Sequence, residues 1–497
     1  MHSSSRTIQL PGPGVGRSQF ILVGGLAARL TLFVIITSFL GRGLSAADFG
    51  FIALVFGIFL VAHELIDFGT TALVTRRVAS QPQIEFETLN TLFAWRRLLC
   101  IALALLMLAG SFALALGFDQ QCVLVIAAFA LLAMPLTSYH VIFQTRQAYG
   151  QATLLGLGSH LAFLLASAAV LHLTPEHVPS GWSSGAMVGL LVVVRELVQL
   201  AGSRALARRM LGRTLSAAWR DPGIGQLLRS TINYGLAGVG YKLSALSGSF
   251  FVWILAGPQA LGSYGAAQRL FTPQTEAAWL FATPLIAAMS LDAVQQNKVM
   301  HAKLTALTQL MLALSSGVAV CGLFLAPTIL QWLYGVRYAD GATSSVATFQ
   351  WLSLAMTFAL VTPVLAVACL VHRRETQLMQ ISFAGLAATV LGNLLLVSQH
   401  GAQGAAMAWC AGEAVVMLTL LTLALVQGDL KTGWDWLVYL VPGALLAIVL
   451  SLLSPWPLAQ FIGGALVLGA GLLLLRRLPP QQAARTAYAP AVSGNTP

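Results

Sequence analysis

Apolar stretches of about 20 residues recur along the whole chain, and they decide what it can fold into. A helix of this length crosses the hydrocarbon core of a bilayer, roughly 30 Å thick. The stretches are unbroken, whereas strands of a membrane barrel alternate apolar and polar residues over about 10 positions. Of the 497 residues, 57% are hydrophobic and only 9% are charged. The sequence therefore predicts an all-α, multi-pass membrane protein.

We expect fourteen transmembrane helices. They fall near residues 19–40, 48–73, 96–117, 121–143, 151–172, 183–204, 230–256, 261–287, 305–334, 345–371, 377–398, 402–426, 434–453 and 457–475. The basic residues support this count, because only Arg42 and Arg337 lie in the loops of one side, whereas the terminal tails and the loops of the other side hold nearly all the rest. By the positive-inside rule, we expect both termini to lie in the cytoplasm.

The spans divide into two sets of six with a weak internal repeat. The first carries Arg29-Leu30, and the second carries Lys242-Leu243 at the corresponding place. Six is an even number, so the two lobes have parallel topology, an arrangement that puts a substrate site at the interface of the repeats. The expected organisation is a tail (1–18), a six-helix lobe (19–204), a basic linker (205–229), a second six-helix lobe (230–427), two peripheral helices (428–475) and a cytoplasmic tail (476–497).

Four basic residues, Arg29, Arg195, Lys242 and Arg269, lie inside apolar stretches. A cation near the membrane midplane is costly unless it faces a partner, a cavity or a ligand, so each is a candidate for a functional site. Arg195 is followed by Glu196, but adjacent helical residues point about 100° apart and should not pair well with each other. We therefore expect Arg195 to have a structural partner elsewhere in the first lobe.

Several ordered segments resemble the polysaccharide flippase family (Wzx-type), a branch of the multidrug/oligosaccharidyl-lipid/polysaccharide exporter superfamily. They are residues 44–50 (LSAADFG), 67–72 (DFGTTA), 76–77 (RR), 262–270 (GSYGAAQRL), 333–338 (LYGVRY) with Ala342, 392–394 (GNL) and 401–406 (GAQGAA). The resemblance covers about residues 20–427 and implies two lobes that alternate between inward- and outward-open states. Overall likeness suggests an exopolysaccharide system of the xanthan type.

This resemblance implies a cargo of undecaprenyl-pyrophosphate-linked oligosaccharide, moved from the cytoplasmic to the periplasmic leaflet. Arg29, Lys242 and Arg269 lie on the spans that line the central cavity in the superfamily, where cations would hold the pyrophosphate. The alternative is a structural ion pair, with Glu276 as a candidate partner of Arg269. These two residues stand about 10.5 Å apart along one helix, so a direct pair is strained.

Acidic residues in the spans are candidates for coupling transport to H⁺ or Na⁺. Glu64 and Asp67 can share a helix face with His63, because the three positions are three and four residues apart. Asp67 has the alternative of a cap or a pair with Arg76 or Arg77. Glu276 and Glu413 complete the candidates; Glu413 is the sole charged residue of its predicted span. The sequence HELID at 63–67 lacks the second histidine of a zinc-protease helix, so we expect neither a metal nor another cofactor.

Two other functions remain open. A drug/cation antiporter of the same superfamily would have acids rather than cations in its cavity, and a polysaccharide polymerase or glycosyltransferase would need a larger extramembrane segment. We therefore expect a flippase, not an enzyme, that has no catalytic residues and binds no nucleic acid. Its partners would be the lipid-linked oligosaccharide, the bilayer, and a polymerase with export machinery.

Overall fold

The computed structural model is almost entirely helical over the residues that it describes, namely 14–71, 74, 78, 85–113, 116–133, 139, 141–143, 149–172, 182–212, 215, 224–294, 298–340 and 344–430. No strand occurs among them. The contacts group the chain into two compact units, residues 1–239 and 240–497. The boundary falls inside the first helix that the sequence assigned to the second lobe.

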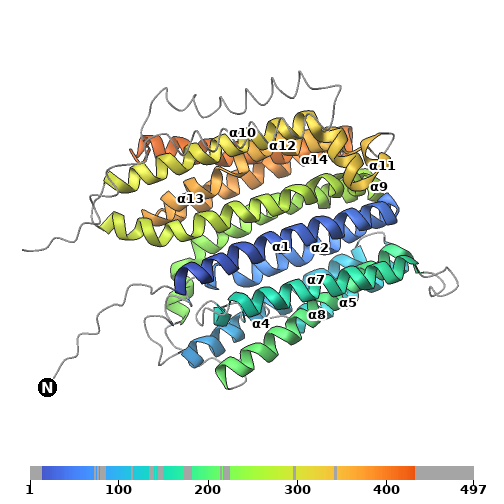
Figure 1. Cartoon of the computed structure of the whole chain (residues 1–497), viewed down its shortest axis with the longest axis horizontal. Coiled ribbons are helices and arrows are strands. Elements are labelled where there is room, and N and C mark those ends of the chain that lie inside the picture. Colours follow the sequence, from blue (N-terminus) through green and yellow to red (C-terminus); the bar gives the residue numbers. More distant parts are fainter. Residues whose placement is uncertain are drawn as a thin grey trace, which may run out of the picture. The chain divides into compact units, whose positions relative to one another are not determined.

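The first unit contains helices α1 (Gly14–Gly43), α2 (Ala46–Asp67), α4 (Glu85–Ala113), α5 (Phe118–Ala133), α7 (Tyr149–His172) and α8 (Ser184–Leu211), followed by the start of α9 (Ile224–Val294). α8 packs against α2, α5 and α7, and α1 packs against α7. Figure 1 shows these helices running side by side. α8 continues beyond residue 204 into the predicted linker and ends at Gly212, whose φ of 65° is a left-handed C-cap.

The second unit contains the rest of α9, then α10 (Lys298–Tyr334), the short α11 (Val336–Ala339), α12 (Val346–Ala359), α13 (Thr362–Val371) and α14 (Glu375–Val426). α12 packs between α10 and α14 (Figure 1). Helices α12 and α13 together form one apolar segment, Val346–Val371, interrupted near Leu360. The predicted spans 434–453 and 457–475 lie outside the described residues, so the count of fourteen stays a prediction.

Eight helices of the described part are long and apolar enough to cross a membrane. Two of these segments, Ile232–Thr272 and Glu375–Val426, are 41 and 52 residues long. A straight helix of 52 residues would extend about 78 Å, more than twice the hydrocarbon thickness. Each instead breaks at a glycine with positive φ, Gly257 (87°) and Gly401 (55°). Both breaks lie where the sequence predicted one span to end and the next to begin.

The two halves of α14 form a closely packed antiparallel hairpin. A Cβ placed on Gly392 would come 2.9 Å from the Cβ of Ala408, and one on Gly412 would come 3.0 Å from the carbonyl oxygen of Gly385. Small residues allow this approach, as is common between membrane helices. The halves of α9 meet similarly, where Gln268 Nε2 donates to the carbonyl oxygen of Ala245 at 2.9 Å.

One charged residue lies elsewhere than expected. The sequence placed Arg96 in a cytoplasmic loop at the start of a span, but α4 begins eleven positions earlier, at Glu85. The side chain of Arg96 is fully buried. Hydropathy alone missed the polar first turns of this helix, where the polar residues Thr88, Asn90 and Thr91 are buried in the protein instead of lying in solvent.

The close approach within α14 predicts that Gly412→Ala destabilises the protein. The added methyl group would displace Thr389 and press on the Gly385 backbone, and overpacking of this kind costs about 1–3 kcal/mol. We expect a lower melting temperature in detergent, measured by intrinsic fluorescence. Gly158→Ala is the control, since a Cβ at Gly158 meets nothing within 4 Å. Equal melting temperatures for the two variants would contradict close packing at Gly412.

Candidate functional site: charges inside the membrane helices

The end of α2 is joined to α4 by a buried ion pair. Arg96 Nη2 lies 2.5 Å from Asp67 Oδ1, and the same guanidinium donates to Thr70 Oγ1 at 2.7 Å and to Thr71 Oγ1 at 2.9 Å. Thr71 also bonds to the Asp67 carboxylate. The guanidinium thus satisfies its donors within the protein, as a buried cation requires. Asp67 therefore has a structural role whatever its part in ion coupling.

A second charged network joins α2, α7 and α8. His63 Nε2 lies 3.3 Å from Glu196 Oε2, and Arg195 pairs with the other oxygen of Glu196. Arg195 also lies 3.3 Å from His160 Nε2 and stacks 4.9 Å from the ring centroid of Phe56. Our expectation that Arg195 and Glu196 would pair poorly is wrong. The long arginine side chain bends around the helix and brings its guanidinium to the neighbouring carboxylate.

Arg29 lies on α1 beside this network. Its side chain is exposed on the first unit, and its charge is close enough to interact with His160 of α7. The packing of α1 against α7 explains this proximity. Arg29 therefore differs from Arg195, whose side chain is only 9% exposed and is surrounded by an acid and aromatic rings.

Glu64 and Asp67 both approach Tyr234 at the start of α9, where their charges act on its hydroxyl group. A Cβ on Gly238 would come 3.1 Å from Glu64 Oε1, so the carboxylate lies against the α9 backbone. His63 instead contacts α8. The three polar residues of α2 thus reach three different helices rather than forming a single cluster.

In the second unit, both predicted cations lie on α9. Arg269 is 5% exposed, and its charge is within electrostatic range of the Tyr338 hydroxyl of α11. Lys242 is half-buried and follows Tyr241, whose ring packs edge-on against Trp279 with centroids 6.0 Å apart. The side chain of Glu276, the candidate partner of Arg269, lies outside the described part of the structure.

Among the predicted coupling acids whose side chains the structure describes, Glu413 is the most deeply buried. Its side chain in α14 is 2% exposed and lies beside the hydroxyl of Tyr241 and the indole of Trp409, both neutral hydrogen-bond donors. Near this site, the hydroxyl oxygens of Ser244 in α9 and Thr389 in α14 lie 2.8 Å apart. Asn393 Nδ2 of α14 donates a hydrogen bond to Ser247 Oγ of α9 at 3.1 Å. Glu413 is therefore part of a polar seam between α9 and α14.

A further polar cluster lies outside the spans, after α13 and α14. Asp429 accepts a hydrogen bond from Arg374 Nη1 at 2.6 Å, and its other carboxylate oxygen lies 3.2 Å from His372 Nε2. Burial, together with the nearby Arg374 charge, lowers the pKa of His372 below its ordinary value despite the opposing effect of Asp429. The cluster ties the end of α14 to the α13–α14 turn.

The structure thus brings some predicted residues together and separates others. Glu64 and Asp67 share Tyr234, and Arg29 adjoins the Arg195 network. Sequence reasoning missed His160 and Arg96 as network members. His160 had a readable signal, because it interrupts an apolar span; Arg96 had none, because its position near a span end is typical of a topology signal.

The Asp67–Arg96 pair predicts that Asp67→Asn destabilises the protein by about 3 kcal/mol, since it leaves a buried guanidinium without its counter-charge. A thermal melt of the purified protein measures the loss. Asp340→Asn is the matched control, because Asp340 is exposed at the end of α11.

The double variant Asp67→Leu/Arg96→Met separates structure from transport. Removal of both charges should recover stability. Recovered transport in this variant would mean that Asp67 has only a structural role, whereas a stable variant without transport would assign Asp67 to the mechanism. A single variant as stable as the wild type would refute the ion pair itself.

Comparison with known proteins agrees with the geometry. The family model described as "Polysaccharide biosynthesis protein" matches residues 17–290. Among solved structures, the lipid II flippase MurJ in an inward closed conformation superposes with a TM-score of 0.69 at 14% identity, covering 93% of this chain and 99% of that chain. No curated protein sequence matches significantly.

Two transporters have a similar fold at lower scores. A multidrug resistance MATE family transporter of the MOP superfamily, in an inward-facing conformation, has a TM-score of 0.54 at 12% identity and covers 82% of this chain and 98% of that one. A MOP superfamily transporter from Pyrococcus furiosus has a TM-score of 0.58 at 15% identity, covering 83% of this chain and 95% of that chain. With the family match over more than half of its length, the chain belongs to the family described as "Polysaccharide biosynthesis protein", and its helical fold is similar to those of MurJ and the MOP superfamily transporters.

Proposed function

We propose that the protein flips undecaprenyl-pyrophosphate-linked oligosaccharide repeat units from the cytoplasmic to the periplasmic leaflet of the bacterial inner membrane. The repeat units would then be polymerised into an exopolysaccharide. The overall likeness of the sequence suggests a system of the xanthan type. Each membrane-crossing cycle would expose the binding site first to one side and then to the other. A polymerase and export machinery would consume the product.

The presence of cations on membrane helices carries this proposal. Arg29, Lys242 and Arg269 all lie within apolar segments, and Arg269 is 5% exposed. A pyrophosphate is the part of the cargo most costly to move through hydrocarbon, and cations lower that cost. Arginine offers a planar fork of donors that fits phosphate oxygens, whereas lysine supplies a compact charge. We assign the three cations to the anionic head of the cargo.

Coupling to H⁺ is assigned to Glu413. A carboxyl group that carries a proton in one state and loses it in another needs an environment that does not hold it permanently charged. The hydroxyl and indole donors beside Glu413 are neutral. Asp67 is instead bound to Arg96, which makes it a weaker candidate. Glu64 and Glu276 remain candidates, and Na⁺ is the alternative coupling ion.

The competing function is export of cationic drugs by antiport. The MATE transporters that share the fold give this alternative its basis. For the MOP transporter from Pyrococcus furiosus, reversed polarity of the binding pocket suggests a different function. Charge sign is thus a reasonable criterion within this fold, and the cations here favour an anionic cargo.

Replacement of each cation by alanine tests the cargo assignment. We expect Arg29→Ala, Lys242→Ala and Arg269→Ala to lower polysaccharide export about tenfold or more, equivalent to at least about 1.4 kcal/mol of lost interaction with phosphate. Lipid-linked repeat units should accumulate in the inner leaflet. Complementation of a flippase-deficient strain, with expression checked by immunoblot, measures both effects.

The matched controls are Arg229→Ala and Arg373→Ala, which remove exposed basic residues outside the spans. Arg269→Lys keeps the positive charge but lacks the planar set of guanidinium donors, so we expect its export to lie between that of Arg269→Ala and that of the wild type. Normal export by all three well-expressed alanine variants would refute the assignment. Accumulation of unpolymerised units on the periplasmic side would favour the polymerase alternative.

The coupling assignment predicts that Glu413→Gln removes the response to a pH gradient. Purified protein in liposomes should move a fluorescent lipid-linked oligosaccharide faster when a gradient is imposed, and the variant should not. Asp340→Asn, at an exposed acid, should respond like the wild type. A full gradient response in a folded Glu413→Gln protein would exclude Glu413 and direct attention to Glu64 and Glu276.

A further inference from the structure

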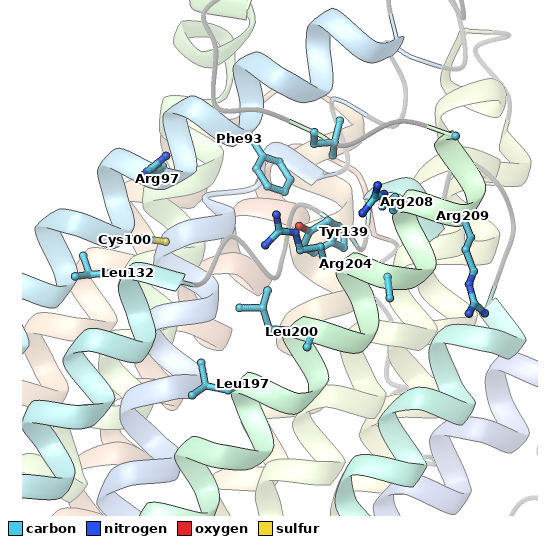
Figure 2. A pocket seen from close by; sticks show the side chains of 14 residues that line it. Phe93, Arg97, Cys100, Leu132, Tyr139, Leu197, Leu200, Arg204, Arg208 and Arg209 are labelled. Carbon is cyan, nitrogen blue, oxygen red and sulfur yellow. The ribbon is translucent and has the colours of Figure 1, made fainter.

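A large pocket opens beside the end of α8, within the first unit. It has a volume of about 1170 Å³, and most of its walls come from α4 and α8, with contributions from Leu132 of α5, Tyr139 and Leu215. Four of its residues are arginines: Arg97 on α4, and Arg204, Arg208 and Arg209 on α8. Figure 2 shows Arg97 on one side, Arg208 and Arg209 on the other, and Arg204 next to Tyr139 in the middle.

The lining of the pocket changes from apolar to basic along α8. Along α8, Leu197 and Leu200 come first, and Arg204 and Arg208 follow on successive turns of the same face. Arg204 is also within electrostatic range of the Tyr139 hydroxyl. No acidic residue occurs among the described residues that line the pocket. The apolar floor therefore lies toward the membrane interior and the positive charge toward the predicted cytoplasmic surface.

Like charges one turn apart on a helix destabilise it, and here a third cation approaches from α4. All of Arg97, Arg204 and Arg208 are exposed, so they are free to bind a mobile anion. Neighbouring cations raise the local positive potential and concentrate anions. Guanidinium groups bind phosphate oxygens by paired hydrogen bonds, so the chemistry of the rim selects a phosphate group.

A second groove continues the pocket along the outside of α4 and α5. It has a volume of about 410 Å³ and shares Arg97 and Leu132 with the first pocket. The remaining lining is apolar, and Ile101, Leu105 and Phe129 are 40%, 62% and 62% exposed. From Arg97 to Leu108 the α4 face extends about 16 Å, close to one half of a hydrocarbon core of roughly 30 Å.

We propose that this surface binds an anionic phospholipid of the cytoplasmic leaflet, with the phosphate between Arg97, Arg204 and Arg208 and one acyl chain in the α4–α5 groove. The groove is as long as one leaflet is deep, which fits an acyl chain. The apolar floor offers no path for a bulky hydrophilic glycan, which argues for a membrane lipid rather than the cargo.

Native mass spectrometry of the purified full-length protein tests the site. With phosphatidylglycerol added in detergent, we expect one lipid to be retained, and we expect at least fivefold less retention with phosphatidylcholine. Arg204→Gln/Arg208→Gln should reduce phosphatidylglycerol retention about tenfold, as loss of two charge-assisted contacts predicts. The control Arg229→Gln/Arg373→Gln removes the same charge from exposed positions elsewhere and should retain the lipid.

Each further result supports or refutes the proposal. Arg204→Lys/Arg208→Lys keeps the charge and should retain more lipid than the glutamine variant; its elution as a single species on size exclusion checks folding. Displacement of the lipid by glycerol 3-phosphate at equal concentration would indicate a soluble-anion site and refute the lipid assignment. Tighter, arginine-dependent retention of undecaprenyl phosphate would assign the surface to the cargo instead. Unchanged retention in the double glutamine variant would refute the site altogether.

Discussion

A charged group on a membrane helix must find its partners within the protein, because hydrocarbon supplies neither hydrogen bonds nor counter-ions. The first unit is organised around this requirement. Arg96 binds α4 to the end of α2, and Glu196 binds α8 to His63 of α2. Through His160, the same network reaches α7. Polar contacts thus fix which helices are neighbours in a unit whose apolar surfaces would pack with little discrimination.

The second unit depends more on close backbone approach. Glycines at Gly385, Gly392 and Gly412 let the two halves of α14 pack closely, and a hydroxyl–amide seam joins α14 to α9. Glu413 lies in that seam beside neutral donors, whereas Asp67 and Glu196 of the first unit are each paired with an arginine. This difference in partners is the physical basis for our proposal that Glu413 couples transport to H⁺ and for the structural role of the Asp67 pair.

The basic residues of the chain therefore have different physical roles despite similar chemistry. Arg96 and Arg195 neutralise acids within the first unit. For Arg29, Lys242 and Arg269 we propose contact with the anionic head of the cargo. Arg97, Arg204 and Arg208 surround a pocket that continues into an apolar groove. A count of basic residues along the chain does not distinguish these three groups. The positive-inside rule uses only the position of each residue along the chain and not its partner.

The sequence by itself determined the all-helical membrane fold, the approximate course of most predicted spans within the described residues, the two places along the chain where α9 and α14 break, and the family. Hydrophobic length and glycine placement are local properties, so they can be read along the chain. Only the tertiary structure decided the partners of the charged residues. His63, Glu64 and Asp67 are neighbours on one helix but contact α8, α9 and α4, and Arg195 reaches its own neighbour by bending back. Such choices depend on which helices pack together and on how far a long side chain extends, and neither is encoded in the spacing of residues along one helix.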